Sequence, residues 1–430
     1  MFNFNLSLHA NGSGLNPQLP SPELEHDAPQ TLITDEAAVR LATGSAPMDT
    51  PRIVMQVAED ECVAQGAPLA HLSNAPTVQL VAPMPARVAR IALLPGKRLH
   101  EIVLYREAGN DVVEHSVNDV ATDSALRVLL QKAGIWPWLR RRPFGGMPAP
   151  DERPAAILVM AHDTRPFAPD PLVALEGRET GFTQGLIALT RLTDGPVLLC
   201  VRRGASLVNS PHARVRIVHS GARHPQGSPG IRVHALAPAT LEAPVWDLHA
   251  EDVATIGELL ECGTVAMTRL VSVAGSALRT RRLVHTQPGA DLRALTQRSL
   301  LPGAHQLLSG SPLEGHMAHW LAPRDRQVSA LSLNTQKKSP HWLFSALTNT
   351  GRARPVIPSA ALSQAFGAAL PAMPFVRALS AGDDESALEL GLLSLLEEDM
   401  ALADYVLGGD TQLAARLRST LERVRETFVS

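Results

Sequence analysis

The sequence predicts a mixed α/β and α+β protein built from several domains, and three observations support this prediction. The chain has 430 residues, which is too long for one ordinary hydrophobic core. Two short apolar runs flank a segment with helical spacing between residues 155 and 201, a pattern typical of a β–α–β unit with a parallel sheet. Short strands separated by turns precede and follow this unit, and the last sixty residues have helical periodicity.

Composition and pattern divide the chain into five expected segments. They are a poorly anchored leader (1–30), a β-sandwich that resembles biotinyl and lipoyl domains (31–110), a Rossmann-like α/β domain (111–262), a β-grasp domain (263–350) and a helical C-terminal domain (351–430).

The expected β-sandwich has short apolar runs at 54–57, 64–69, 78–83 and 86–93. Biotinyl and lipoyl domains carry their prosthetic group on a lysine in the hairpin between their two halves. The corresponding hairpin here, residues 71–76, contains no lysine. We therefore expect a packing module without lipoyl or biotin, and a swinging-arm carrier is the alternative.

The α/β domain begins with a helix predicted over residues 120–133. A buried strand follows at Ala155–Ala161, then a helix at Glu176–Leu192 and a second strand at Val197–Val201. Asp163 and Thr164 come directly after the first strand, and open α/β sheets bind ligands at the carboxyl ends of their strands. Asp163 is the expected polar site here, either touching a ligand or orienting the neighbouring loop.

A basic and aromatic cluster precedes the first strand of this unit. It contains Trp136, Trp138, Arg140–Arg142, Pro143 and Phe144. Arginine donates hydrogen bonds and stacks on rings, so this segment is a candidate for holding an aromatic or quinone head group. The alternative is a solvated basic loop beside a few packing aromatics.

Further along the domain, His224 is expected in a turn and His234 in an alternating strand at 231–236, before a helix at about 251–262. Strands are expected at 268–274 and 281–286. His316 and His319 have i,i+3 spacing, but no third ligand lies nearby in the sequence, so we expect no metal site.

Two amphipathic helices are predicted near the end of the chain. Asp383 or Asp384 can cap the first, over 385–407. The second starts at Asp410-Thr411 and carries an apolar stripe from Leu413 to Phe428. An intramolecular bundle is the default expectation for such stripes, and docking on another protein of a complex is the alternative.

Composition excludes several classes of protein. The 39 Lys and Arg residues nearly balance the 42 Asp and Glu residues, which gives no electrostatic footprint for nucleic acid. No apolar run approaches the roughly 20 residues that span a bilayer, and the N-terminus lacks signal-peptide features. We therefore expect a soluble, cytoplasmic protein.

Motifs for cofactors are scarce in this chain. Three cysteines without CxxC spacing offer neither a disulfide framework nor a cysteine-ligated cluster. No GxGxxG, GxxxxGK or GxSxG occurs, and Gly145-Gly146 is the nearest match to a phosphate loop. The bulky side chains of 140–144 would obstruct a flavin phosphate there. We expect a nucleotide-binding fold that no longer holds its nucleotide.

The order of these segments resembles the NqrA family, whose members are subunits of the sodium-translocating NADH:quinone oxidoreductase, a bacterial respiratory complex. The matching motifs are Gly134-Ile135-Trp136, Arg142-Pro143-Phe144, Asp163-Thr164 with Pro166, Gly185-Leu186 with Leu189-Thr190, Cys200, Ser272–Gly275 and Ser309–Gly315. The matches are spread over most of the chain, and each motif alone is weak.

This resemblance implies a cytoplasmic, cofactor-free subunit, peripheral on the inner face of the bacterial membrane, that supports assembly and ubiquinone reduction at a membrane subunit. FAD, FMN, riboflavin and iron–sulfur would belong to other subunits of the complex, which transports sodium, and this chain would hold no complete active site. A diverged paralogue in another membrane redox assembly and an autonomous small-ligand-binding protein are the alternatives. Candidate contacts to quinone or to a partner are Trp136, Arg140, Arg142, Pro143, Phe144, Asp163, Thr164 and His224.

Overall fold

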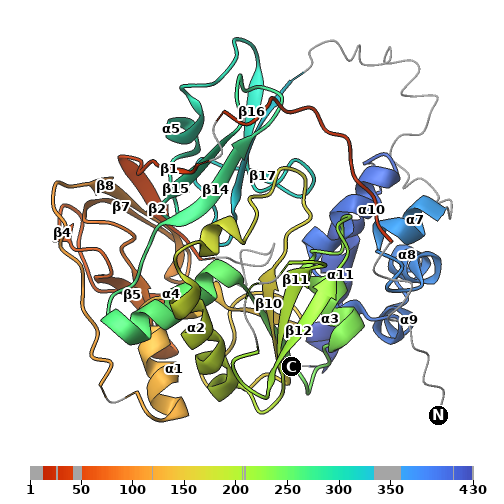
Figure 1. The fold of residues 1–430 in the computed structure, drawn as a ribbon, viewed down its shortest axis with the longest axis horizontal. Coiled ribbons are helices and arrows are strands. Elements are labelled where there is room, and N and C mark those ends of the chain that lie inside the picture. Colours follow the sequence, from red (N-terminus) through yellow and green to blue (C-terminus); the bar gives the residue numbers. More distant parts are fainter. Residues whose placement is uncertain are drawn as a thin grey trace.

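In the computed structural model, the described residues form four β-sheets with helices packed around them (Figure 1). The structure describes residues 13–25, 28–41, 51–118, 120–205, 207, 210–333, 360–409 and 411–428. Asp410, expected to start the last helix, and residues 351–359 of the expected C-terminal domain lie outside this set.

Two antiparallel sheets follow the N-terminal segment, in the region where the sequence predicts short strands. Their strand orders are β2-β8-β7-β4 and β3-β5-β6. The strands are β2 (Glu36–Val39), β3 (Ile53–Met55), β4 (Cys62–Val63), β5 (Pro68–Leu72), β6 (Ala75–Val81), β7 (Ala86–Leu94) and β8 (Arg98–Arg106). Buried residues of both sheets, such as Leu80 and Leu104, belong to one apolar core. The turn from β5 to β6 is formed by Ser73 and Asn74.

A five-stranded sheet of order β12-β11-β10-β13-β9 forms the centre of the molecule (Figure 1). Its strands are β9 (Arg140–Arg142), β10 (Ala156–Ala161), β11 (Val197–Arg202), β12 (Val215–Ser220) and β13 (Val245–His249). Strands β10 to β13 are parallel, and β9 runs antiparallel to β13. Every residue of β10 is buried because helices cover both faces of the sheet. The predicted β–α–β unit is confirmed.

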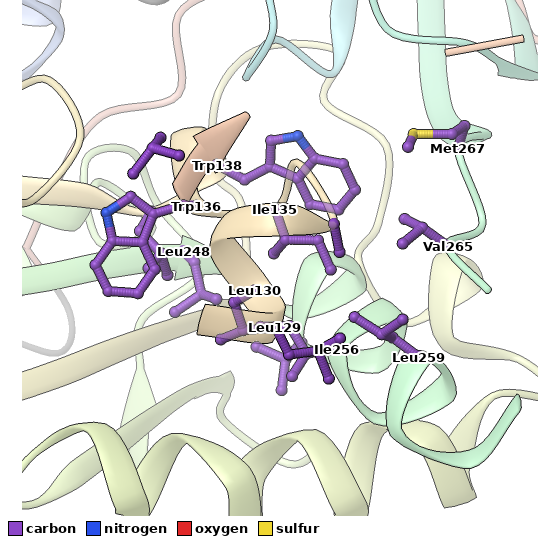
Figure 2. Packing of buried hydrophobic residues seen from close by; sticks show 14 of the residues in the cluster. Leu129, Leu130, Ile135, Trp136, Trp138, Leu248, Ile256, Leu259, Val265 and Met267 are labelled. Carbon is purple, nitrogen blue, oxygen red and sulfur yellow. The ribbon is translucent and has the colours of Figure 1, made fainter. Parts of the chain in front are cut away.

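Apolar residues from alternate positions of the sheet pack into two separate cores. One face meets α1 (Asp123–Lys132), α2 (Glu179–Leu192) and α4 (Ala250–Cys262), and the other meets α3 (Pro229–Leu236). Figure 2 shows the first core, where Leu129 and Leu130 of α1 lie near Ile256 and Leu259 of α4. Two short 3-10 helices, η4 (Trp136–Trp138) and η5 (Val173–Leu175), complete this region.

The segment 231–236, expected as a strand around His234, is helical and forms most of α3. This prediction was wrong because the segment's alternation of apolar and polar residues was given more weight than its start signal. Ser228 precedes Pro229 at the first helical position, and proline there is preorganised for a helix.

A six-stranded sheet of order β1-β15-β14-β18-β16-β17 lies above the central sheet in Figure 1. Its strands are β1 (Gln30–Thr31), β14 (Arg269–Ala274), β15 (Arg282–Thr286), β16 (His305–Ser309), β17 (His316–Met317) and β18 (Gln327–Ser332), with the short helix α5 (Leu292–Thr296). The strands expected at 268–274 and 281–286 are confirmed.

The N-terminal segment is tied to the rest of the fold over its described residues. The Leu15 amide donates to the His224 carbonyl at 2.7 Å, and the Glu25 amide donates to the Arg281 carbonyl at 2.8 Å. β1 pairs in parallel with β15. The expectation of a poorly anchored leader is therefore wrong for residues 13–25 and 28–30. Backbone hydrogen bonds of this kind leave no periodic signal in a sequence.

Helices of the last segment gather at one side of the central sheet (Figure 1). They are α7 (Ala360–Ala365), α8 (Ala372–Ala381), α9 (Asp384–Glu389), η6 (Leu392–Ser394), η7 (Glu397–Met400), α10 (Ala401–Val406) and α11 (Leu413–Phe428). Asp383 caps α9 by accepting from the Ser386 amide at 3.0 Å, as expected.

The single helix expected over 385–407 is instead broken into four short pieces. Gly391 has a φ of 101° after α9, and Leu395 and Leu396 are extended. A left-handed glycine ends a helix, and the second break follows Ser394 without a glycine or proline to mark it in the sequence. This prediction was wrong in length, although the residues are mostly helical.

The apolar stripe of α11 faces inward from Leu413 to Val424, whereas Phe428 at its end is exposed. Leu413, Leu417 and Leu421 are fully buried, and they share a core with Phe144 and Ile231 of the α/β domain. The expected intramolecular packing is confirmed, so these three side chains are not free to dock on another protein.

Within the described part of the chain, no helix combines the length and the apolar character needed to cross a membrane.

Candidate functional site

A cavity of about 130 Å³ lies at the carboxyl ends of β10 and β13. It occupies the edge of the parallel sheet where the sequence analysis placed Asp163. The residues that line it come from every unit after the sandwich: Trp138, Arg140, Met160, His162, Asp163, Arg165, Gly227, Ser228, Pro229, Asp247, Leu248, His249, Asp252, Glu314, Arg324, Asp325 and Glu398.

Asp163 orients the loop after β10 and also links it to another unit. Its carboxylate accepts from the Arg165 backbone amide at 2.9 Å and from Arg165 Nε at 3.0 Å. Arg165 Nη1 lies 2.8 Å from Glu314 Oε1, in the loop after β16. Burial acts to raise the pKa of Asp163, but the charge and hydrogen bonds of Arg165 outweigh it and hold that pKa below its usual range.

Glu314 shares Arg165 with Asp163 and is the less stabilised of the two carboxylates. Burial raises the pKa of Glu314 to about 7, and the attraction of Arg165 offsets only part of that rise. This group therefore changes its charge near neutral pH.

Thr164 and His224 lie side by side beneath the cavity. The Thr164 hydroxyl accepts from the Gly227 amide at 2.9 Å and lies 3.2 Å from His224 Nδ1. His224 comes directly before a turn at residues 225–227, close to the turn position predicted for it. The peptide bond between His224 and Pro225 is cis. Burial lowers the pKa of His224 to about 4, so the imidazole is neutral at pH 7.

Arg140 and Arg142 belong to β9, and the expectation of a solvated basic loop is wrong. Arg142 is fully buried, forms an ion pair with Asp247 and donates to the Ser394 carbonyl at 2.9 Å. Arg140 lies 3.1 Å from Asp247 and 2.5 Å from Glu398. Although burial acts to raise the pKa of Asp247, Arg140 and Arg142 hold it below its usual range.

Two aromatic members of the predicted cluster, Trp136 and Phe144, are packing residues, whereas Trp138 lines the cavity. Trp136 is buried, donates to the Pro148 carbonyl at 3.0 Å and meets Trp246 edge-on at 5.5 Å between ring centres. Pro143 and Phe144 are also buried, and Phe144 packs in the core of the C-terminal helices. Of the eight predicted site residues, the structure places Arg140 and Asp163 at the cavity wall.

The cavity also contains two histidines that sequence reasoning did not assign to a site. Ser220 donates its hydroxyl to the Val201 carbonyl at 3.2 Å, and His162 Nδ1 lies 2.7 Å from the Ser220 oxygen. This arrangement assigns the ring proton of His162 to Nδ1 and leaves Nε2 as an acceptor. His162 and His249 follow or end two parallel strands, so the strand-end rule that located Asp163 could have found both.

A wider groove of about 620 Å³ continues from this cavity. Both are lined by Arg140, Glu314, Arg324, Asp325 and Glu398. Gly145 and Gly146, the nearest match to a phosphate loop, lie in the groove with φ angles of 77° and 75°. No signal near Glu314, Arg324 or Glu398 in the sequence predicted that these residues would meet.

The two histidines with i,i+3 spacing, His316 and His319, are both exposed. Over the residues that the structure describes, no group of three or more His, Cys, Asp or Glu side chains is placed to hold a metal ion.

Comparisons with known proteins identify relatives along most of the chain. A family model described as "NqrA second alpha/beta domain" matches residues 121–265, and one described as "NQRA C-terminal domain" matches residues 270–319. The A subunit of the Na(+)-translocating NADH-quinone reductase of Teredinibacter turnerae is 32% identical over 404 residues, which cover 86% of this chain and 90% of the relative. The protein of the same name from Shewanella amazonensis is 31% identical over 429 residues, which cover 92% and 96%.

Among solved structures, an NAD+-reducing NiFe hydrogenase in the H2-reduced state aligns with 72% of this chain and 67% of its own, at 13% identity and a TM-score of 0.39. This likeness is too low to support a conclusion about fold or function.

Proposed function

The chain belongs to the NqrA family, the A subunits of the Na(+)-translocating NADH-quinone reductases, and from this membership we propose that it acts within such a complex. The single observation that carries the proposal is the extent of the match, because relatives of this name align with 86% to 92% of the chain. A match to one shared domain would not identify the complex, whereas a match of this length extends beyond the two domains that the family models cover.

We further propose that the chain supports assembly and quinone reduction rather than carrying a redox cofactor itself. FAD, FMN, riboflavin and iron–sulfur would be held by the flavoprotein and membrane subunits that are its partners. The chain would lie on the cytoplasmic side of the membrane, against a membrane subunit. The buried ion pair between Arg142 of β9 and Asp399 of the C-terminal segment suits a rigid positioning role.

We also propose a fold for each of three units of the chain. The parallel order β12-β11-β10-β13 supports a Rossmann-like domain, since its four strands run 3-2-1-4 in chain order. The two antiparallel sheets of residues 36–106 support a biotinyl/lipoyl-like sandwich. The mixed sheet with α5 supports a β-grasp domain over 263–350, of which residues 334–350 lie outside the described part of the chain.

For contact with ubiquinone, we propose Arg140 and Asp163, which line the cavity. Thr164 would support the Asp163 loop by accepting a hydrogen bond from the Gly227 amide, and His224 would do so through its hydrogen bond with Thr164. Trp136, Arg142, Pro143 and Phe144 are buried, so their part in any contact would be to hold the backbone of β9 in place.

The proposal is tested by deleting the gene for this chain and purifying the complex through a tag on a membrane subunit. We expect membranes from the deletion strain to lose NADH-dependent quinone reduction, and a plasmid copy to restore it. An Asp163→Asn variant should raise the KM for quinone while leaving the KM for NADH unchanged, whereas the exposed Arg298→Gln control should change neither.

Two results would contradict the proposal. A complex purified without this chain that reduces quinone at the normal rate would remove the chain from the assembly. Stoichiometric recovery of the chain with another membrane redox assembly would favour a paralogue. The cavity and groove keep an autonomous small-ligand-binding protein as a second candidate, which recovery of the chain without any membrane protein would favour.

A further inference from the structure

Arg324 lies where the cavity joins the groove, and it lines both of them. Its Nη2 atom is 3.5 Å from the Pro137 carbonyl, at the limit of a hydrogen bond. Its Nε atom is buried and has no hydrogen-bond partner among the described residues. The Arg324 guanidinium therefore has N–H donors free to bind a ligand where the cavity meets the groove.

The other charged side chains at this wall have partners. Arg165 pairs with Asp163 and Glu314, Arg140 with Asp247 and Glu398, and Arg326 with Asp252, while Asp325 accepts from the Ser309 hydroxyl. In the described part of the chain, no carboxylate oxygen lies within 4.0 Å of Arg324. Of the three arginines that line the cavity, Arg140 and Arg165 form ion pairs, and Arg324 forms none with the described residues.

His249 supplies a second donor to the same cavity. Its Nδ1 accepts from the Glu251 amide at 3.2 Å and caps α4, so the ring proton of the neutral imidazole lies on Nε2. The Nε2 atom is buried without a partner among the described residues. Burial, reinforced by the nearby Arg326 charge, lowers the pKa of His249 to about 3, so this tautomer holds at neutral pH.

A buried cation without a counter-ion is unfavourable, as is a buried N–H without an acceptor. Burial and the repulsion of Arg140 lower the pKa of Arg324 to about 9, and the more distant charges of Asp247, Glu398 and Asp252 offset only part of this effect. A bound anion would relieve both defects, because it offers a counter-charge and acceptor oxygens.

We propose that this cavity binds the carboxylate group of a small molecule, held by Arg324 with His249 as a second donor. Six acidic residues also line the cavity: Asp163, Asp247, Asp252, Glu314, Asp325 and Glu398. Their negative field disfavours a dianion such as phosphate and allows a single negative charge more readily. A carboxylate also matches the planar donor fork of an arginine. The inference does not depend on the proposed function, because it rests on donors within this chain alone.

The test uses the purified full-length chain, with sodium acetate as the probe and sodium chloride at equal ionic strength as the reference. Ligand that binds only the native state raises the unfolding temperature, so we expect acetate to raise it by about 2–4 °C and phosphate by less. Arg324→Gln should abolish the acetate shift. The exposed Arg298→Gln variant, from the same unit, should keep it.

Two further measurements of unfolding temperature show whether Arg324 and His249 bind a ligand or only stabilise the fold. Arg324→Gln should unfold at or above the wild-type temperature without acetate, because it removes a buried charge that has no directly paired carboxylate. His249→Asn can still cap α4 through its side-chain oxygen but lacks the Nε2 donor, so it should lose part of the acetate shift. This variant also keeps the test open if Arg324→Gln fails to fold.

Equal shifts with acetate and chloride in the wild-type chain would overturn the proposal. An acetate shift that survives in both Arg324→Gln and His249→Asn would do so as well. A shift larger with phosphate than with acetate would replace the carboxylate by a phosphate group. Loss of quinone reduction in the gene deletion has no bearing on these outcomes, so the two proposals can fail separately.

Discussion

Glu314 illustrates how one residue's chemistry depends on partners that are distant in the sequence. It lies 149 residues from Arg165, with which it forms an ion pair, and Arg165 is shared with Asp163. One guanidinium cannot fully stabilise two buried carboxylates, so the pKa of Asp163 falls while burial raises the pKa of Glu314 to about 7.

We predict that this shift makes stability depend on pH. The folded-state pKa of Glu314 exceeds its ordinary value of 4.5, so its contribution to stability is fully present below about pH 4.5 and is lost as the pH rises through about 7. Glu314→Gln should therefore match the wild type near pH 4.5 and be more stable above pH 7, by roughly 1–3 kcal/mol.

Urea unfolding of both chains at several values between pH 4.5 and 8.5 measures this difference. Exposed Glu389→Gln controls for the removal of one carboxylate. A Glu314→Gln difference that stays constant across this range would show that Glu314 titrates at its ordinary pKa.

At the residue scale, the sequence predicted position better than partnership. Asp163 was placed at a strand end from the buried run before it, and the structure puts it at the cavity wall. For Arg142 the sequence left open a ligand contact or a solvated basic loop, and its full burial excludes the solvated loop. Its counter-charges, Asp247 and Asp399, come from distant segments of the chain. No local sequence pattern predicts these contacts.

At the scale of elements, the sequence correctly predicted the helices and strands whose apolar residues follow a strong, continuous period. The runs that became β10, β11, α2 and α4 were predicted close to their observed ends. Errors arose where a few residues decide between structures, as in α3 and in the broken helices after Gly391. Short segments gain little from their own hydrogen bonds, so tertiary packing determines their form.

Close contact between α2 and α4 is a feature of elements that periodicity does not reveal. Gly185 of α2 lies against the backbone of α4, and a Cβ atom there would be 1.9 Å from the Val253 carbonyl oxygen. Gly257 of α4 would meet the Gly181 carbonyl of α2 at 1.8 Å. Glycine at these positions allows the two helices to approach closely.

We predict that Gly185→Ala destabilises the chain by about 1–3 kcal/mol, since overpacking a tight contact forces the helices apart. Alanine favours an exposed helix over glycine by up to about 1 kcal/mol, which works in the opposite direction. Gln184→Ala, at the exposed neighbouring position of α2, serves as the control. Thermal unfolding compares the stability of the wild type, Gly185→Ala and Gln184→Ala. A Gly185→Ala chain as stable as the wild type would refute the close contact.

At the scale of the whole molecule, the cavity exists because separate units are held against one another. The α/β sheet supplies Asp163 and Asp247, the sheet of residues 263–333 supplies Glu314 and Arg324, and the C-terminal helices supply Glu398. Phe144 and Ile231 of the α/β domain also complete the core of those helices. The sequence predicts several units, but their relative placement depends on contacts between segments up to 350 residues apart.

Arg142 is the buried ion-pair centre of this assembly, and it provides the sharpest test of the interface. It joins Asp247 of β13 to the Ser394 carbonyl and to Asp399 in the C-terminal segment. Removing one partner of a buried ionic network leaves the others uncompensated, so Arg142→Met should cost about 3–5 kcal/mol. Arg153→Met removes the exposed pair with Asp194 and should cost less than about 1 kcal/mol. Equilibrium urea unfolding compares the two, and similar losses would mean that solvent screens Arg142 as it does a surface charge. A large loss within a single urea transition would indicate that the C-terminal helices and the central sheet unfold as one unit.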